Sequence, residues 1–390
     1  MNKFFLDLGQ QPLANNYLAF FKDKQIKYNL KLFFNTKNKI VSISKRIQSK
    51  KMFTNNYPYR SSMSKTMKNS FFKLSLEIKK KFNPKKILEI GSNDGALITN
   101  FDKKKVIGIE PCNNLAKITS KKGFITYNKY WNYKLAQKLK RKHGNIDLIY
   151  SANTLTHISN LNDVFRSISY LLSKKGILII EDPSLLECMK KTAYDQFYCE
   201  HIYVYSAIAL SNILKKFKLE IFDIEHTSTH GGSNRYYIKK GINKKLIIRK
   251  NVFDTLKKEI RYGLKNFITY KKFSKRVNNS KMRLIKIFND LKNKKIIGYG
   301  ATAKSCTVLN FCKIGTDNIS YFYDTTSYKI GKYLPGTKIE IRKYKKLNHK
   351  KIDYVFLGAW NFKSEIFKKE KKFKKLGGKF ITHIPKPQII

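Results

Sequence analysis

One short stretch, DQFYCEHIYVYS at residues 195–206, gathers side chains that can move a proton. His201 follows Glu200 directly and lies three residues after Tyr198. A histidine has an unperturbed pKa of about 6.5, so its neutral ring can accept a proton near neutral pH. A neighbouring carboxylate can orient that ring, and a phenol can donate a hydrogen bond to an oxygen on which charge develops. The stretch predicts general-base chemistry with His201 as the base.

A second stretch, ILEIGSNDGALI, predicts a strand, a glycine-rich turn and the start of a helix. Glu89 ends the strand, and Gly91 and Gly95 allow a tight turn with close approach of the backbone to a ligand. The next predicted strand, VIGIEP, ends in Glu110, nineteen residues after Gly91. A carboxylate at this offset can accept hydrogen bonds from ribose hydroxyls. Together these features predict nucleoside binding by a Rossmann-like unit.

The residues of this turn favour S-adenosylmethionine over a dinucleotide. Asn93 stands where a dinucleotide loop has its second glycine, and Asp94 would bring a carboxylate close to a pyrophosphate. The same carboxylate is favourable beside a sulfonium or an amino group. In the later stretch IDLIYSANTLTHI, Asn153 and His157 are the polar candidates for the methyl-donor pocket. An NAD-dependent dehydrogenase or epimerase is the weaker alternative.

Short β-branched runs alternate with helical patterns in two separate parts of the chain. The first series contains KKILEIG, KKVIGIEP, GNIDLIYSA and KKGILIIEDP, and the second contains KKIIGYGATAKS, ISYFYDT, KIDYVFLGAW and GGKFITHIP. Such alternation predicts mostly parallel sheets with helices on both faces. Apolar spacing predicts a helix after Ser64 and a continuous helix over 251–291. We expect an α/β chain with a short N-terminal segment (1–55), a Rossmann-like unit (56–245), and a helical linker followed by a second Rossmann-like unit (246–390).

Composition argues against several functional classes. The 81 Lys and Arg exceed the 26 Asp and Glu, giving a net charge of +55, but the excess is mostly Lys and is spread along the chain. Without a helix-turn-helix or an RNA-binding aromatic signature, we expect no nucleic-acid binding. We expect no signal peptide and no membrane insertion, because no apolar run approaches the length of a spanning helix. Five cysteines without paired spacing argue against a disulfide framework and favour the reducing cytoplasm.

Taken together, several stretches resemble one family, the S-adenosylmethionine-dependent C-methyltransferases that act on nucleotide-linked keto sugars in deoxysugar biosynthesis. The stretches occur in the family's order and span nearly the whole chain: LDLGQQPLANNYL, YPYRSSMS, LEIGSNDGALITNF, GIEPCNNLAK, YCEHIYVYS, THGGSNRYYI, IGYGATAKSCTVLN and YDTTSYKIGKYLPGTKIEI. The resemblance implies a class I methyltransferase domain and a C-terminal domain that helps hold the nucleotide diphosphate of a keto-sugar substrate. It also implies methylation of a carbon next to a ketone, and we expect a monomer or a small homo-oligomer.

The implied reaction gives roles to particular residues. His201 would remove the proton α to the ketone, and Glu200 would either orient it or handle a sugar hydroxyl. Tyr198, Tyr59 or His230 would donate to the enolate oxygen. Further residues, in THGGSNR, in GYGATAK and after it, are expected to meet the substrate: His230, Gly231, Ser233, Arg235, Lys304, Asn310 and Asp324. Among them, Lys304 and the backbone amides of GYGATAK suit a phosphate.

Two departures from the family pattern are visible. Family members usually carry an N-terminal zinc module with cysteine pairs before and after the LG-x-x-PLAN stretch. Here the first pair has no room, and Asn35 and Asn38 stand where the second pair would be, so zinc is not expected. Cys199 stands between the tyrosine and the glutamate, where a histidine is common. Two other functions stay open: an O- or N-methyltransferase acting on another small molecule, and a non-catalytic basic binding protein.

Overall fold

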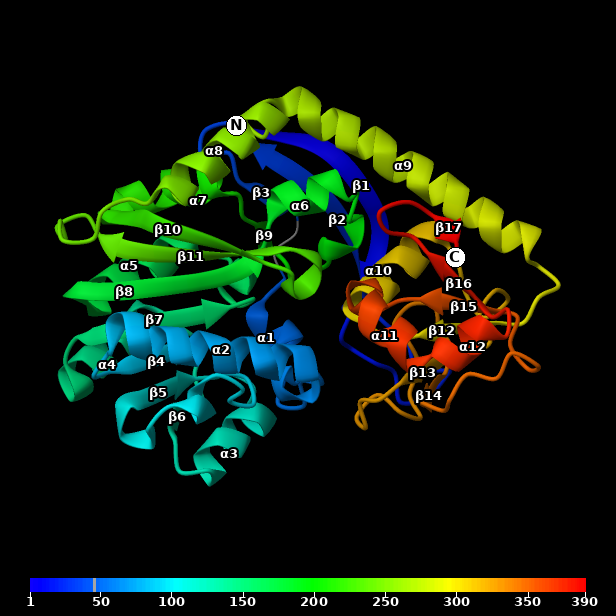
Figure 1. The fold of residues 1–390 in the computed structure, drawn as a ribbon, viewed down its shortest axis with the longest axis horizontal. Helices are drawn as coiled ribbons and strands as arrows, with labels where there is room; N and C mark the ends of the chain where they lie inside the picture. Colours follow the sequence, from blue (N-terminus) through cyan, green and yellow to red (C-terminus); the bar gives the residue numbers. More distant parts are fainter. Residues whose placement is uncertain (45–46) are drawn as a thin grey trace.

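The computed structural model describes residues 1–44 and 47–390, which form three sheets (Figure 1). A four-stranded sheet holds the N-terminal strands, a seven-stranded sheet holds the middle of the chain, and a six-stranded sheet holds the C-terminal part. The two larger sheets lie side by side in Figure 1, and the N-terminal strands together with helix α9 (Phe267–Asp290) arch over both.

The seven-stranded sheet has the order β10-β11-β8-β7-β4-β5-β6. The pairings among β4 to β8 are parallel, whereas β11 pairs antiparallel with both β8 and β10. The chain order reverses at β4, which pairs with both β5 and β7, and ligand crevices of open α/β sheets lie at such a switch point. Its strands are β4 (Ile87–Ile90), β5 (Val106–Ile109), β6 (Ile125–Tyr127), β7 (Ile146–Ala152), β8 (Leu172–Pro183), β10 (Leu219–Thr227) and β11 (Ser233–Lys240).

Helices cover both faces of this sheet. On one face α2 (Lys65–Phe82) buries Phe71 and Leu74 against the strands, and the other face packs on α4 and α5. The side-chain oxygen of Ser64 caps α2 by accepting a hydrogen bond from the Met67 amide at 3.3 Å, which confirms the predicted helix. The remaining helices of this part are α1 (Ser49–Met52), α3 (Asn113–Lys121), α4 (Tyr133–His143), α5 (Leu161–Leu171), α6 (Leu185–Lys190) and α7 (Ala207–Leu214).

The six-stranded sheet has the order β14-β13-β12-β15-β16-β17 and is parallel except for its last strand. The second predicted βα series is therefore confirmed, and with it the α/β fold class with two Rossmann-like units. Its elements are β12 (Ile296–Tyr299), α10 (Ala303–Cys312), β13 (Phe322–Asp324), β14 (Ile341–Lys343), β15 (Tyr354–Leu357), α11 (Lys363–Lys369), α12 (Lys371–Lys375), β16 (Lys379–Thr382) and β17 (Gln388–Ile389).

The four-stranded sheet joins the N-terminal residues to the histidine stretch. Its strands are antiparallel in the order β1-β2-β3-β9, and β9 (Tyr203–Val204) begins two residues after His201. Its apolar side chains pack on α9, where the rings of Phe34 and Tyr270 stack with centroids 4.4 Å apart. The other strands are β1 (Asn2–Pro12), β2 (Lys27–Asn35) and β3 (Val41–Ile43).

The prediction of one continuous helix over 251–291 is wrong. Two helices occupy this range, α8 (Lys250–Tyr262) and α9. Gly263 ends α8 in the left-handed conformation with φ of +90°, which glycine adopts without steric cost. On α8 the predicted apolar stripe is only partly covered, since Phe253 is 50% exposed and Ile260 is 46% exposed.

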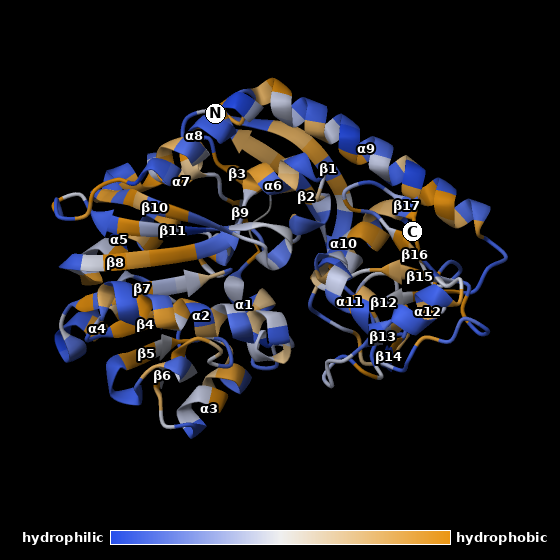
Figure 2. Ribbon diagram, in the orientation of Figure 1, coloured by the Kyte–Doolittle hydropathy of each residue, from blue (hydrophilic) through white to orange (hydrophobic). Residues whose placement is uncertain are grey.

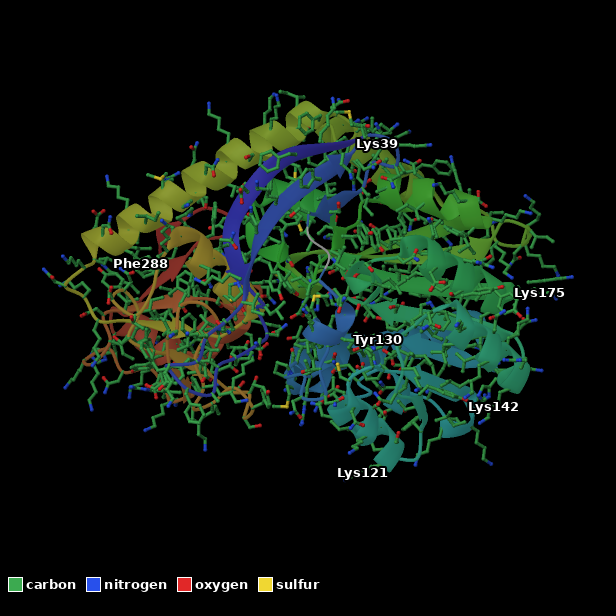
Figure 3. All side chains as sticks on the ribbon, turned by 180° about the vertical axis from the view of Figure 1, so that it is seen from behind. Lys39, Lys121, Tyr130, Lys142, Lys175 and Phe288 are labelled. Carbon is green, nitrogen blue, oxygen red and sulfur yellow. The ribbon has the colours of Figure 1, made fainter. Side chains whose placement is uncertain are left out.

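Polar and apolar residues separate as expected for a folded α/β chain. Figure 2 shows apolar residues concentrated along the strands of the two larger sheets and hydrophilic residues on the outward surfaces of the helices. Lysines such as Lys121, Lys142 and Lys175 project from the periphery (Figure 3). Among the helices of the described residues, none has the length and apolarity needed to cross a membrane.

Candidate active site

A large cavity of about 1040 Å³ opens where the three sheets meet. Its wall includes the glycine turn after β4, the ends of β5 and β7, the histidine stretch, the start of α10 and one N-terminal residue, Asn15. The carboxyl ends of parallel strands therefore face the same space in both Rossmann-like units. Such a place is where open α/β sheets bind their ligands.

The glycine turn is built as its sequence predicts. Gly91 has φ of +77° and packs so closely that a Cβ atom there would lie 2.1 Å from Thr154 Oγ1. The Glu110 carboxylate holds the turn, because its Oε2 accepts from the Asn93 amide and its Oε1 accepts from the Cys112 amide, both at 2.8 Å. Burial raises the pKa of Glu110, although these amides oppose the shift. A negative edge of the cavity is thus fixed beside the turn.

The side chains of Asn93 and Asp94 form hydrogen bonds with the segment before α2 instead of pointing freely into the cavity. Asn93 Oδ1 accepts from the Ser61 amide at 2.9 Å, and its Nδ2 donates to the Tyr59 carbonyl at 3.2 Å. Asp94 Oδ2 accepts from the Ser62 hydroxyl at 2.5 Å. Asn93 and Tyr59 line the cavity, whereas the Asp94 carboxylate is buried against the segment before α2. Gly95, with φ of +85°, turns the chain outside the cavity lining.

Several buried polar atoms of the cavity wall lack a partner among the described residues, and two of them, on Glu89 and His157, indicate a polar ligand. Glu89 Oε2 and His157 Nε2 have no hydrogen-bond partner among the described residues, although both residues line the cavity. Burial raises the pKa of Glu89 well above 4.5 and lowers that of His157 to about 3. Native proteins seldom leave such atoms unpaired, so a ligand with an amino group and hydroxyls would satisfy this wall. Asn153, with φ of +49°, completes it. These residues fit S-adenosylmethionine.

His201 is held in one tautomer. Its Nδ1 donates to the Gln196 carbonyl at 2.7 Å, so Nε2 is the acceptor atom of the neutral ring. Nε2 lies 2.5 Å from the Tyr198 hydroxyl, which donates to it. Burial lowers the pKa of His201 well below 6.5, and the neighbouring His157 ring, 5.1 Å away between centroids, lowers it further. His201 is therefore neutral at neutral pH and carries a lone pair facing the cavity wall.

Glu200 points to different partners from those expected. Its oxygens accept from Asn15 Nδ2 at 2.8 and 2.9 Å and from the Tyr57 hydroxyl at 2.7 Å. Burial raises the pKa of Glu200 to about 7, and these two donors limit the shift. The Gln196 carbonyl, rather than Glu200, orients His201.

Asn15 and Tyr57 were not assigned roles from the sequence, although both lie in stretches that carry the resemblance. Asn15 ends PLAN, and Tyr57 is the first tyrosine of YPY. The second tyrosine, Tyr59, is 41% exposed at the edge of the cavity. Cys199 is buried, and its Sγ lies 3.6 Å from the Pro12 carbonyl oxygen. The N-terminal segment therefore packs directly against the histidine stretch.

Three substrate candidates reach the cavity: His230, Lys304 and Asp324. The His230 carbonyl accepts from Lys304 Nζ at 3.2 Å and from Gln196 Nε2 at 2.6 Å. Asp324 Oδ2 accepts from the Ala301 amide at 2.9 Å, so it closes the GYGATAK turn.

Four other substrate candidates do not reach it. The Ser233 hydroxyl donates to the Thr229 carbonyl at 3.0 Å. Arg235 forms buried ion pairs with carboxylates of β8 and β10, at 2.9 and 3.0 Å. Asn310 Nδ2 donates to backbone carbonyls, at 2.8 Å to Cys306. Gly231 lies against the Trp360 ring, which a Cβ there would approach to 2.3 Å. The polar side chains among them bond to other residues of the chain and not to the cavity. Residue type and spacing in the sequence do not reveal such partners.

The N-terminal loop does not fit a zinc ion. Asn35 Oδ1 accepts from the Lys37 and Asn38 amides, both at 3.0 Å, and Asn38 Oδ1 accepts from the Ile40 amide at 3.2 Å. Side-chain amides therefore close the turn where the family's second cysteine pair would stand. Within residues 1–44 and 47–390, the structure holds no group of three or more His, Cys, Asp or Glu placed to bind a metal ion.

Comparison with known proteins agrees with this arrangement. A family model described as "Methyltransferase domain" matches residues 59–224, and one described as "C-methyltransferase C-terminal domain" matches residues 228–385. The C-methyltransferase NovU of Streptomyces niveus is 30% identical over 308 residues, which cover 78% of this chain and 73% of that protein.

Solved structures with a similar fold were also found. An S-adenosylmethionine-dependent methyltransferase from Anabaena variabilis is 15% identical, covers 49% of this chain and 90% of its own, and has a TM-score of 0.38. One from Clostridium acetobutylicum is 13% identical, covers 44% and 91%, and has a TM-score of 0.34. On the match to the Streptomyces enzyme and to the two family models, the chain belongs to the S-adenosylmethionine-dependent C-methyltransferase family.

Proposed function

We propose that this enzyme methylates a carbon next to the ketone of a nucleotide-linked keto-hexose, through removal of the α proton and formation of an enolate. The observation that carries the proposal is the neutral His201, whose acceptor atom Nε2 lies in the wall of the same cavity as the glycine turn. A methyl acceptor on oxygen or nitrogen already has a lone pair, whereas a carbon acceptor needs its proton removed first.

The donor side of the cavity is proposed to be the wall that contains the glycine turn. S-adenosylmethionine, when bound, supplies an electrophilic methyl group on a positively charged sulfur. Gly91 would let the backbone approach it, the Glu110 carboxylate would accept from ribose hydroxyls, and the unpaired Glu89 oxygen would meet its amino group. Asn153 and His157 would complete this wall.

The proton step is proposed to use the His201 and Tyr198 pair. The donor bond from Nδ1 to the Gln196 carbonyl keeps the lone pair on Nε2, where the α proton would arrive. The substrate's α carbon would replace the Tyr198 hydroxyl at Nε2, and the displaced phenol would then donate to the developing enolate oxygen. Glu200 is buried outside the cavity lining and would fix Asn15 and Tyr57, which line the cavity and could meet a sugar hydroxyl.

The acceptor side is proposed to be the wall formed by the six-stranded part. The GYGATAK turn and Asp324 occupy the place that holds nucleotides in Rossmann-like sheets. Exposed cations lie at the cavity mouth and suit a diphosphate: Arg60, Lys65 and Lys369. His230 and Lys304 would contact the sugar end of the substrate.

A mass-spectrometric assay in D₂O tests the proposal. The purified protein is incubated with S-adenosylmethionine and a panel of nucleotide-linked 4-keto sugars, and a gain of one methyl group is located by fragmentation. We expect the methyl on carbon, together with deuterium at the α carbon when the donor is omitted. His201→Asn should abolish both signals. A methyl group found on oxygen or nitrogen, or carbon methylation that survives in His201→Asn, would overturn the proposal.

A further inference from the structure

Lys304 is a buried cation that forms no ion pair with a carboxylate among the described residues. Its side chain is 8% exposed at the start of α10, and among the described residues no carboxylate oxygen lies within 4.0 Å of Nζ. Its one assigned hydrogen bond, at 3.2 Å, goes to the His230 carbonyl, and Nζ lies 5.0 Å from the Trp360 ring centroid. An ammonium has three N–H donors, and burying it unpaired costs several kcal/mol, roughly, unless a ligand meets it.

A short series of hydrogen bonds connects Lys304 with His201. The His230 carbonyl accepts from both Lys304 Nζ and the Gln196 side chain, and the Gln196 carbonyl accepts from His201 Nδ1. The side chain of Gln196 is thus fixed by the His230 carbonyl, and the backbone carbonyl of Gln196 is fixed by His201. All four residues line the same cavity. Lys304 and His201 are therefore linked through His230 and Gln196 in the wall of one cavity.

We propose that Lys304 is a catalytic residue whose ammonium binds the ketone oxygen of the substrate and stabilises the enolate. The inference rests on the proposed function. As the α proton moves to His201 Nε2, the C–H electron pair becomes the C=C bond. The carbonyl π pair then moves onto the oxygen that Lys304 holds. A fixed cation at that oxygen acts where charge develops and needs no rearrangement during the step.

The surroundings of Lys304 favour a ketone oxygen over the diphosphate to which its sequence context points. Beside it lies the His230 carbonyl oxygen, which accepts from both Lys304 Nζ and Gln196 Nε2. The buried Asp195 carboxylate adds negative charge to these surroundings, because it opposes the lowering of the Lys304 pKa that burial causes. The negatively charged phosphates of a nucleoside diphosphate sugar would be repelled by these oxygens more strongly than a neutral ketone oxygen would be. The exposed cations at the mouth are left for the diphosphate.

The experiment compares Lys304→Met and Lys304→Gln with the wild type, and uses Lys142→Met on the surface of α4 as the matched control. The first measurement is deuterium exchange at the α carbon of a saturating keto-sugar nucleotide without S-adenosylmethionine. The second is calorimetric binding of the free nucleoside diphosphate. We expect Lys304→Met to slow exchange by about 10²–10³-fold and Lys304→Gln, which keeps a neutral donor, by less. Nucleoside diphosphate affinity should stay within about threefold.

The outcomes separate the two proposals. Exchange at the wild-type rate in Lys304→Met would overturn the role of Lys304 alone. So would a loss of nucleoside diphosphate affinity with unchanged exchange at saturation, because that pattern belongs to a phosphate ligand. Absence of exchange by the wild type with every keto sugar would refute the proposed function and this role with it. Lys304→Met should fold, because it replaces a buried charge by an apolar side chain of similar length. If Lys304→Met does not fold, slower exchange in Lys304→Gln tests the role of the ammonium.

Discussion

His383 Nε2 lies 2.9 Å from Asp195 Oδ2, and both side chains are fully buried. The same carboxylate oxygen accepts from Trp360 Nε1 at 2.6 Å. His383 and Trp360 belong to the C-terminal part, whereas Asp195 directly precedes Gln196, whose carbonyl orients His201. A buried pair therefore fixes the C-terminal part against the neighbour of the residue whose carbonyl orients His201.

Asp195→Asn should destabilise the protein. Its carboxylate makes charge-assisted hydrogen bonds, and losing one of these costs about 1.5–3 kcal/mol. Despite burial, which acts in the opposite sense, His383, Lys304 and Trp360 hold the pKa of Asp195 below its ordinary value of 3.8. The contribution of the Asp195 carboxylate to stability is present above about pH 4 and is lost as the pH falls through its lowered pKa.

Urea unfolding at several pH values measures the effect of Asp195→Asn. The gap between the variant and the wild type should be widest near neutral pH and narrow under acid conditions. Asp317→Asn, at an exposed position, serves as the control and should unfold with the wild type. Equal stability of Asp195→Asn and the wild type at pH 7 would show that the pair does not hold the two parts together.

Tyr198→Phe should change the pH dependence of α-proton exchange as well as its rate. His201 works as a base only when neutral, and its lowered pKa places the acid limb of the profile below pH 6.5. The Tyr198 hydroxyl donates to Nε2 and so favours the neutral ring. Removing it should raise the pKa of His201, move the acid limb to higher pH and slow exchange by about 10²-fold. An acid limb at the wild-type position would contradict this arrangement.

Glu200→Gln should remove a pH dependence of stability. The folded pKa of about 7 lies above the ordinary 4.5, so the contribution of Glu200 is fully present below pH 4.5 and is lost as the pH rises through 7. Between pH 5 and pH 8 the wild type should lose about 2–3 kcal/mol more unfolding free energy than Glu200→Gln. Chemical denaturation at the two pH values provides the measurement, and parallel losses in both proteins would rule out a strongly raised pKa.

Chelation should leave the protein unchanged. Asn35 and Asn38 close the N-terminal turn with their own amides, and the strands around it are held by apolar packing. We expect the same Tm with and without EDTA, and less than stoichiometric zinc by elemental analysis. A fall in Tm on chelation, restored by zinc, would show that metal supports this segment.

Short-range sequence patterns predicted most of the fold. The β-branched runs and the glycine turns are short-range signals, so both series of strands were predicted, as was the helix after Ser64. The break at Gly263 was missed because helical spacing continues on both sides of it.

Long-range partners in the site were missed for a different reason. Asn15 reaches Glu200 across 185 positions, and His383 reaches Asp195 across 188. Neither pairing leaves a mark on local periodicity or spacing. The same holds for Arg235, whose partners are carboxylates on neighbouring strands rather than a ligand.

The position of the N-terminal strands has a consequence for biosynthesis. Asn15 and Tyr17 hydrogen-bond to Glu200 and to the Ala301 carbonyl, and Phe34 stacks on Tyr270. This N-terminal segment therefore waits for partners that are translated much later. Until then its apolar side chains are uncovered, which makes the nascent chain a client for chaperones. Residues that are translated before their partners are thus among the last to reach their final place, and the wall of the cavity is complete only when they do.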